Sequence, residues 1–211
     1  MTRVKRCHVA AAGLVLLAAG ITAASGAAGQ DPDWPCVQRK VPELSLAQIW
    51  TGPELPDASR NWSSDKEISA LVTELSARRV PLEEAQAELR DYAGGLPDDR
   101  SRERMTMLVR GLFDHMNAER SQIISGIARY ARKQRELADT LRKQASELDA
   151  MRGRQDADAS EIASRTDRLT WQTRIFDERV KSLTHVCEVP TLIEQRLYAL
   201  ARTVAEVMAG R

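Results

Sequence analysis

The sequence predicts an all-α fold: a small helical bundle with a long antiparallel coiled-coil hairpin, plus an extended Pro-rich N-terminal strap. Apolar residues recur at alternating three- and four-residue steps through the second half of the chain, which is the heptad pattern of coiled coils. No proline occurs in the 92 residues between Pro97 and Pro190. Aromatic residues make up only 4% of the chain, which argues against a large β-sandwich.

Composition limits the class of protein further. The 211 residues suggest one domain with an appendage, and 43% apolar content is too high for a fully disordered chain. The formal net charge is +1, but residues 1–29 carry three basic and no acidic residues. Without that segment, 28 basic residues face 30 acidic ones, a balance of −2. We therefore expect no nucleic-acid partner, because no basic excess remains to bind phosphates.

Residues 1–29 are predicted to be a signal peptide. Arg3, Lys5 and Arg6 precede an apolar run from Val9 to about Ala24, and small residues follow it. That run is shorter than the roughly 20 residues needed to span a bilayer, although an uncleaved anchor stays open as the alternative. We expect a bacterial protein that is periplasmic or secreted, with no membrane span after cleavage.

Residues 30–62 are predicted to form the extended strap. Five of the eight prolines fall in this stretch, which prevents a long helix, and one helical turn is expected near Ser45–Trp50. Cys36 lies in the strap and Cys187 near the other end of the chain. Export would place both in an oxidising compartment, so we predict a disulfide between them. A metal site or a reactive thiol is the alternative.

Residues 63–211 are predicted to be the helical bundle with its hairpin. Ser64 and Glu67 resemble a capping box that opens the first helix, and Pro81 suits the first turn of the second, which should end at Gly94–Gly95. Pro97 and Asp98 then open a third helix. Its apolar seam has one gap, at residues 119–120, and runs through Met105, Val109, Leu112, Met116, Ile123, Ile127, Tyr130, Gln134, Leu137, Leu141 and Leu148.

The hairpin is expected to turn near residues 150–158, with Asp158 capping the returning helix. Facing residues should then have numbers that sum to about 310. We expect the region of Pro190 to interrupt the returning helix, with Thr191 and Glu194 capping a fifth one. The returning seam should use Ile162, Thr166, Leu169, Thr173, Phe176, Val180, Leu183 and Cys187. The core at the base should include Tyr92, Phe113, Leu192, Ile193, Leu197, Tyr198 and Leu200.

These features favour a non-enzymatic interaction or scaffold protein that binds a protein partner, or self-associates, through the hairpin. Trp171 is the candidate contact residue, because Leu169 and Thr173 occupy the seam and leave Trp171 facing outward. One alternative is a periplasmic copper-binding module, for which thioether and imidazole ligands would come from Met105, Met107, His115 and Met116. The other is an enzyme with a dispersed site. The chain has no HExxH, CxxC, P-loop or GxGxxG motif, and we predict no catalytic residues and no cofactor.

Overall fold

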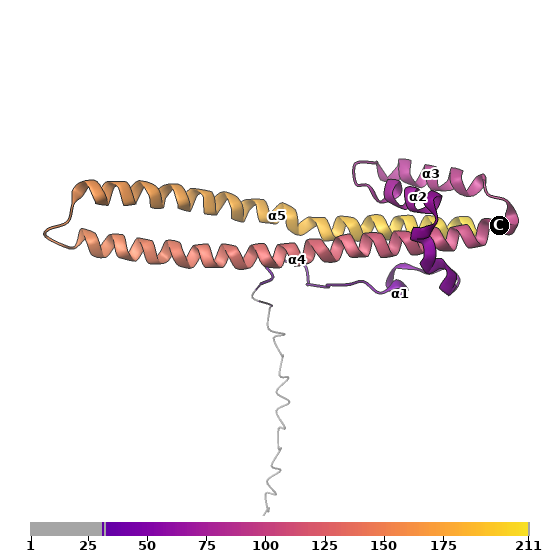
Figure 1. The fold of residues 1–211 in the computed structure, drawn as a ribbon, viewed down its shortest axis with the longest axis horizontal. Coiled ribbons are helices and arrows are strands. Elements are labelled where there is room, and N and C mark those ends of the chain that lie inside the picture. Colours follow the sequence, from indigo (N-terminus) through magenta and orange to yellow (C-terminus); the bar gives the residue numbers. More distant parts are fainter. Residues whose placement is uncertain (1–30, 32, 211) are drawn as a thin grey trace, which may run out of the picture. The chain divides into compact units, whose positions relative to one another are not determined.

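The computed structural model describes residues 31 and 33–210, so the predicted signal peptide lies outside the described residues. All regular secondary structure of the described residues is helical, and they contain no strand. Figure 1 shows the arrangement of its elements. Their bounds are α1 (Leu46–Ile49), the 3-10 helix η1 (Asp57–Ser64), α2 (Lys66–Ser76), α3 (Leu82–Gly94), α4 (Asp98–Arg152) and α5 (Ala159–Ala209).

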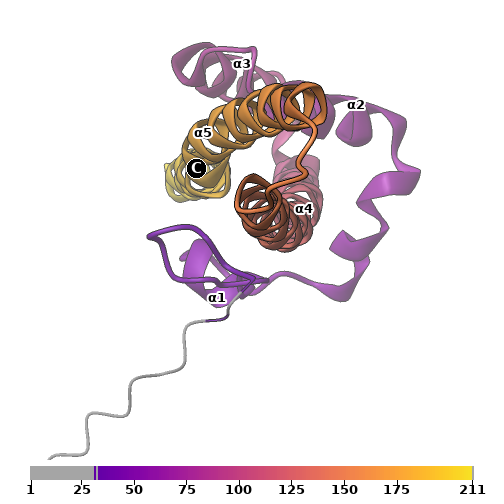
Figure 2. The same cartoon turned by 90° about the vertical axis from the view of Figure 1, so that its left-hand side faces the viewer.

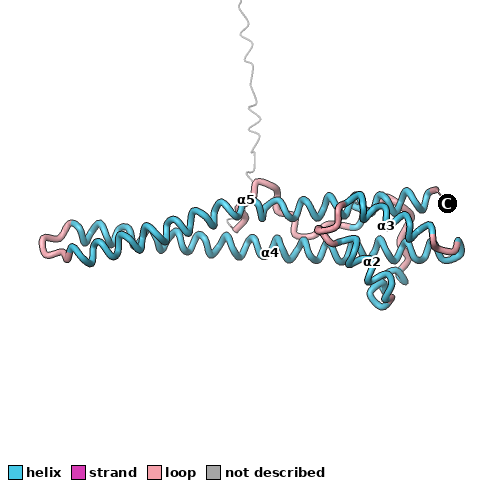
Figure 3. Tube along the Cα trace, turned by 90° about the horizontal axis from the view of Figure 1, so that it is seen from above, coloured by secondary structure: helices cyan, strands magenta, loops and turns pink. Residues whose placement is uncertain are grey.

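The two long helices α4 and α5 pack against each other and run in opposite directions, as a hairpin requires. Figure 2 looks along them and Figure 3 shows them from above, with one loop joining them at the tip. Asp158 caps α5 as predicted, because its carboxylate accepts the backbone N–H groups of Ser160 and Glu161. Two contacts, Arg152 to Thr166 and Arg120 to Glu194, join residues whose numbers sum to 318 and 314. The residue numbers of these facing pairs therefore sum to slightly more than the predicted 310.

The hydrophobic core lies at the base of the hairpin, where α2 packs on α4 and α3 packs on α5. Apolar positions at helical spacing on all four helices meet there, and burying each large side chain stabilises the fold by about 1.5–3 kcal/mol. The fully buried side chains of this cluster include Ile68, Val72, Leu75, Leu89, Met105, Leu108, Leu112, Met116, Ile193, Leu197 and Leu200. Within the predicted core list, Leu192 and Tyr198 are wrong, since they are 53% and 48% exposed.

The stretch between residue 31 and α2 is only partly extended. The predicted helical turn is present as α1, but the sequence did not indicate η1. Pro56 is the N-cap of that 3-10 helix, and its carbonyl accepts hydrogen bonds from both the backbone N–H and the hydroxyl of Ser59. A short 3-10 helix is common in connectors of this kind because it satisfies backbone groups locally.

Two predicted helix boundaries are wrong. The cap of α2 is Asp65, not Ser64: the Asp65 carboxylate accepts the N–H of Ile68 at 3.0 Å, while Ser64 is the last residue of η1. Pro190 does not interrupt α5, which continues through it. A helical proline costs about 3 kcal/mol. Burial of the following turns, which carry the fully buried Ile193 and Leu197, outweighs that cost.

The predicted seam of α5 is also wrong at two positions near the middle of the hairpin. Thr173 and Val180 are exposed, whereas Gln172, Ile175 and Phe176 are half-buried. Ile162, Leu169, Phe176 and Leu183 lie seven residues apart and all stay half-buried. The contact of α5 with α4 is therefore narrower than predicted: it keeps this row of residues, while Thr173 and Val180 on its other edge face solvent.

Candidate interaction surface on the hairpin

The arm of α5 between residues 159 and 186 contains no buried residue, although it packs along α4. On the facing arm of α4, by contrast, Leu141, Leu148 and Met151 are all buried. A two-helix hairpin covers one side of each helix only. The α5 arm therefore leaves a long surface open to another molecule.

Trp171 lies on this open surface and its side chain is 64% exposed. The other three tryptophans each donate the indole N–H to a protein acceptor: Trp34 to the Gln38 carbonyl, Trp50 to the Pro53 carbonyl and Trp62 to the Asp114 carboxylate. Within the described part of the chain, Trp171 has no such acceptor. A large aromatic side chain that is mostly exposed and whose indole N–H has no protein acceptor is typical of a contact surface.

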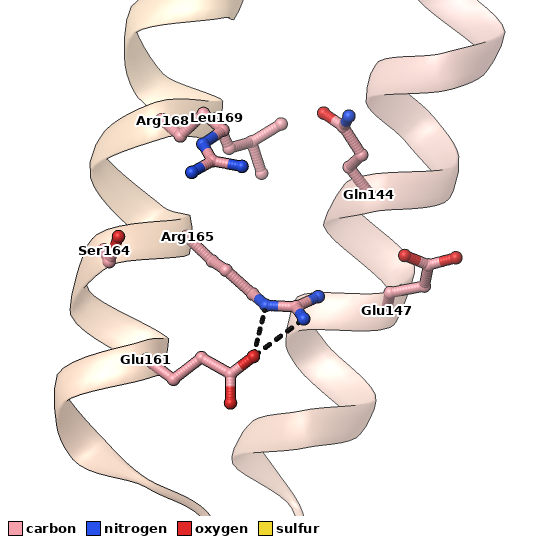
Figure 4. Close-up of a pocket in the computed structure, with 7 residues that line it drawn as sticks. All are labelled: Gln144, Glu147, Glu161, Ser164, Arg165, Arg168 and Leu169. Atoms are coloured by element: carbon pink, nitrogen blue, oxygen red, sulfur yellow. Dashed lines mark hydrogen bonds and ion pairs between the residues drawn. The ribbon is translucent and has the colours of Figure 1, made fainter.

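A hollow of about 340 Å³ separates the two arms near the tip, as Figure 4 shows. Its lining is polar: Arg165 extends from α5 toward α4 and donates two hydrogen bonds, of 3.0 and 2.7 Å, to Glu161. The lining also includes Gln144, Glu147, Ser164, Arg168 and Leu169. Charged and polar side chains from both arms line this part of the seam, so the buried apolar contacts between the arms come from the α4 side, at Leu141, Leu148 and Met151.

The base of the hairpin is tied to the N-terminal segment, which we define as residues 31–45. A disulfide joins Cys36 to Cys187, with 5.5 Å between the Cα atoms. Asn117 of α4 bonds both backbone groups of Leu44: it accepts the N–H at 3.0 Å and donates to the carbonyl at 3.3 Å. The Ser121 hydroxyl donates to the carbonyl of Pro42 at 2.7 Å. These contacts satisfy the backbone of a segment that has no partner strand.

A buried arginine fills the gap in the predicted seam of α4. Arg120 is 4% exposed, donates to the Val41 carbonyl at 2.6 Å and pairs with Glu194 of α5 at 3.4 Å. It thus connects the N-terminal segment, α4 and α5. No motif predicted this role; its only signal in the sequence was the gap in the apolar seam at residues 119–120.

A second buried arginine, Arg196, holds the end of α2. It donates to the carbonyls of Leu75 and Val80, both at 2.8 Å, which lie at the end of α2 and in the connection to α3. Burial lowers the pKa of Arg196 because the charged form loses its water. Helical spacing cannot distinguish such a residue from an exposed arginine, so this role of Arg196 was not predictable from the sequence.

Two carboxylates at the base are held in their charged forms. Arg132 and Arg135 of α4 bind Asp33 and hold the pKa of that carboxyl below its usual value. At the start of α2, the backbone N–H of Ile68 and then the guanidinium of Arg104 lower the pKa of Asp65. Both carboxylates are therefore structural ion-pair partners, and neither has the raised pKa expected of a general acid.

The candidate copper ligands lie in different surroundings in the structure. Met105 and Met116 are fully buried within the hydrophobic core, and Met107 packs against its edge. His115 is exposed beside a shallow hollow lined by Thr73, Ser76, Ala77, Arg78, Arg79 and Glu119. Among the described residues, no three His, Cys, Asp or Glu side chains are placed to hold a metal ion.

Comparison with known proteins found no relative: no family model, curated protein or solved structure matches this chain. No helix within residues 31–210 is long and apolar enough to cross a membrane. The functional interpretation therefore depends on the hairpin surface itself.

Proposed function

We propose that this chain is an exported, non-enzymatic interaction protein that presents the outer surface of its α5 arm to another protein. The single observation that carries this proposal is the 64% exposure of Trp171 on an arm without buried residues. Tryptophan is among the residues that contribute most to protein–protein binding, since one side chain buries a large apolar area on contact.

Export is the second part of the proposal. The basic and apolar pattern of residues 1–29 is typical of a signal peptide, and the Cys36–Cys187 disulfide fits an oxidising compartment such as the bacterial periplasm. Residues 30–62 would act as a strap that fixes the base of the hairpin. The bonds of Asn117 and Arg120 to this stretch support that role.

A photo-crosslinking experiment tests the contact surface. A photoreactive amino acid replaces Trp171 in the protein produced in bacterial cells, and a matched variant carries it at Lys143, an exposed residue of the α4 arm. We expect crosslinked products from position 171 and few from position 143. Equal labelling at both positions, or none at position 171, would overturn the proposal.

A Trp171→Ala variant separates binding from folding. Because this side chain is exposed, the helix content should stay the same, and the unfolding free energy should change by no more than about 0.5 kcal/mol. Association should nevertheless be lost. A variant that associates as the wild type does would contradict the role given to Trp171.

A further inference from the structure

Residues 31 and 33–40 form a loop that closes on itself, which we call the terminal loop. Lys40 pairs with Asp31 at 2.5 Å and so joins its two ends, and the Trp34 indole N–H donates to the Gln38 carbonyl at 2.5 Å. Figure 1 shows this loop in indigo beside α4. None of its described side chains belongs to the hydrophobic core cluster. The bonds within the loop therefore set its shape, but they do not attach it to the helices.

Two kinds of contact attach the terminal loop to the hairpin. One is the Cys36–Cys187 disulfide. The other is the Asp33 carboxylate, which accepts hydrogen bonds from Arg132 and Arg135 of α4. Among the described residues, no other hydrogen bond or ion pair joins this loop to a helix. Both arginines are exposed, and ion pairs made by exposed arginines contribute little in water. The disulfide is therefore the main attachment of the loop.

The rest of the N-terminal segment is attached independently of the disulfide. Arg120 donates to the Val41 carbonyl, and Asn117 bonds both backbone groups of Leu44. The Leu44 side chain is itself buried in the hydrophobic core, as is Ile49 of α1. The chain is thus fixed from Val41 onward by contacts that do not involve either cysteine.

We propose that the Cys36–Cys187 disulfide is a redox-sensitive switch whose reduction releases the terminal loop from the hairpin and leaves the helical fold in place. Without the disulfide, the conformational entropy of the loop outweighs its exposed ion pairs. Release takes the Asp33 carboxylate away from Arg132 and Arg135, so the reduced form presents two free guanidinium groups on α4. This change does not involve Trp171, and the inference goes beyond the proposed function without depending on it.

A dithiol reductant balances the reaction. Its thiolate attacks the sulfur of Cys36, which is half-buried between the exposed Pro35 and Val37, whereas Cys187 is buried. The S–S bond breaks, a mixed disulfide forms at Cys36, and the Cys187 sulfur leaves as a thiolate. The second thiolate of the reductant then displaces the Cys36 sulfur and closes the reductant's own disulfide. Two electrons pass to the protein, and its two thiolates take up the two protons that the dithiol lost.

Nuclear magnetic resonance relaxation of the exported, ¹⁵N-labelled protein tests the release, before and after addition of excess dithiothreitol. Backbone order parameters in residues 33–40 should fall from about 0.85 to below about 0.6 on reduction, while those of Val41 and Leu44 stay near 0.85. The pKa of Asp33, which its two arginines hold below the usual value, should return to that value. Helix content measured by circular dichroism should stay the same.

Two variants serve as controls. Asp33→Asn in the oxidised protein removes the ion pairs alone, and the loop should keep its order parameters because the disulfide still holds it. Cys36→Ser/Cys187→Ser should reproduce the reduced wild type without any reductant, which excludes an effect of dithiothreitol itself.

Several results would overturn the inference. Order parameters in residues 33–40 that reduction leaves unchanged would show that the ion pairs suffice to hold the loop, as would an Asp33→Asn variant whose oxidised loop becomes mobile. A loop that is already mobile in the oxidised wild type would show that the disulfide does not fix it. A loss of order that extends to Leu44, or a loss of helix content on reduction, would show that the loop does not separate from the fold.

Discussion

Removal of the Cys36–Cys187 disulfide should strongly destabilise the protein. The two cysteines are 151 positions apart, so the bond closes a very long loop in the unfolded chain. The chain-entropy relation gives about 5 kcal/mol at 25 °C for a loop of this length, and measured effects are usually smaller. For Cys36→Ala/Cys187→Ala we therefore expect a loss of about 3–5 kcal/mol in unfolding free energy.

Urea denaturation followed by circular dichroism measures this loss. The slope of free energy against urea should also rise, because the unlinked chain exposes more surface when it unfolds. Reduction of the wild-type disulfide is the control. It should reproduce the loss of unfolding free energy, although it breaks only the S–S bond and leaves both cysteine side chains in place. A loss below about 1 kcal/mol in both experiments would refute the reasoning, since the bond would then constrain the unfolded chain very little.

Four further predictions concern the base of the hairpin. Leu197→Ala should destabilise the fold by about 2–5 kcal/mol in the same assay, whereas Leu192→Ala on the exposed side of α5 should stay within about 0.5 kcal/mol; similar losses would place the core elsewhere. Asn117→Ala leaves two backbone groups of the N-terminal segment unpaired and should cost about 1–3 kcal/mol, with faster amide exchange at Leu44; unchanged exchange there would exclude this anchor. The carboxyl of Asp65 should titrate below its usual pKa in an NMR experiment, so its stabilising effect is complete above the unfolded value and is lost as the pH falls through the lowered folded value; a normal pKa would contradict its role as a cap. Copper(I) titration of the exported protein should show no tight binding, because the candidate methionines belong to the core; sub-micromolar binding would revive the copper hypothesis.

The helix ends that were predictable are those set by single residues with strong local effects. Pro81, Gly94–Gly95, Pro97 and Asp158 each act on the backbone directly, and the structure places helix ends at all of them. The hairpin was predictable because its heptad pattern persists over many turns. Local preference and tertiary packing favour the same structure at these positions.

The missed features are those in which distant packing outweighs local preference. Pro190 resembles a helix end until Ile193 and Leu197 are known to be buried. Arg120 resembles a surface residue until the backbone of Val41 is known to lie against it. The candidate surface was predictable at Trp171, because its position relative to the seam follows from helical spacing. The buried arginines were not, since their partners lie about 80 or more positions away along the chain.

The disulfide also changes what a protease can do to this protein. The loop at the tip is exposed at residues 153–156, where a cut would be expected first. Because Cys36 lies before the loop and Cys187 after it, the two resulting pieces stay covalently joined. The nicked protein would run as one band on a non-reducing gel and as two after reduction. Both arms would remain packed, so a single cut at the most accessible point would release neither arm.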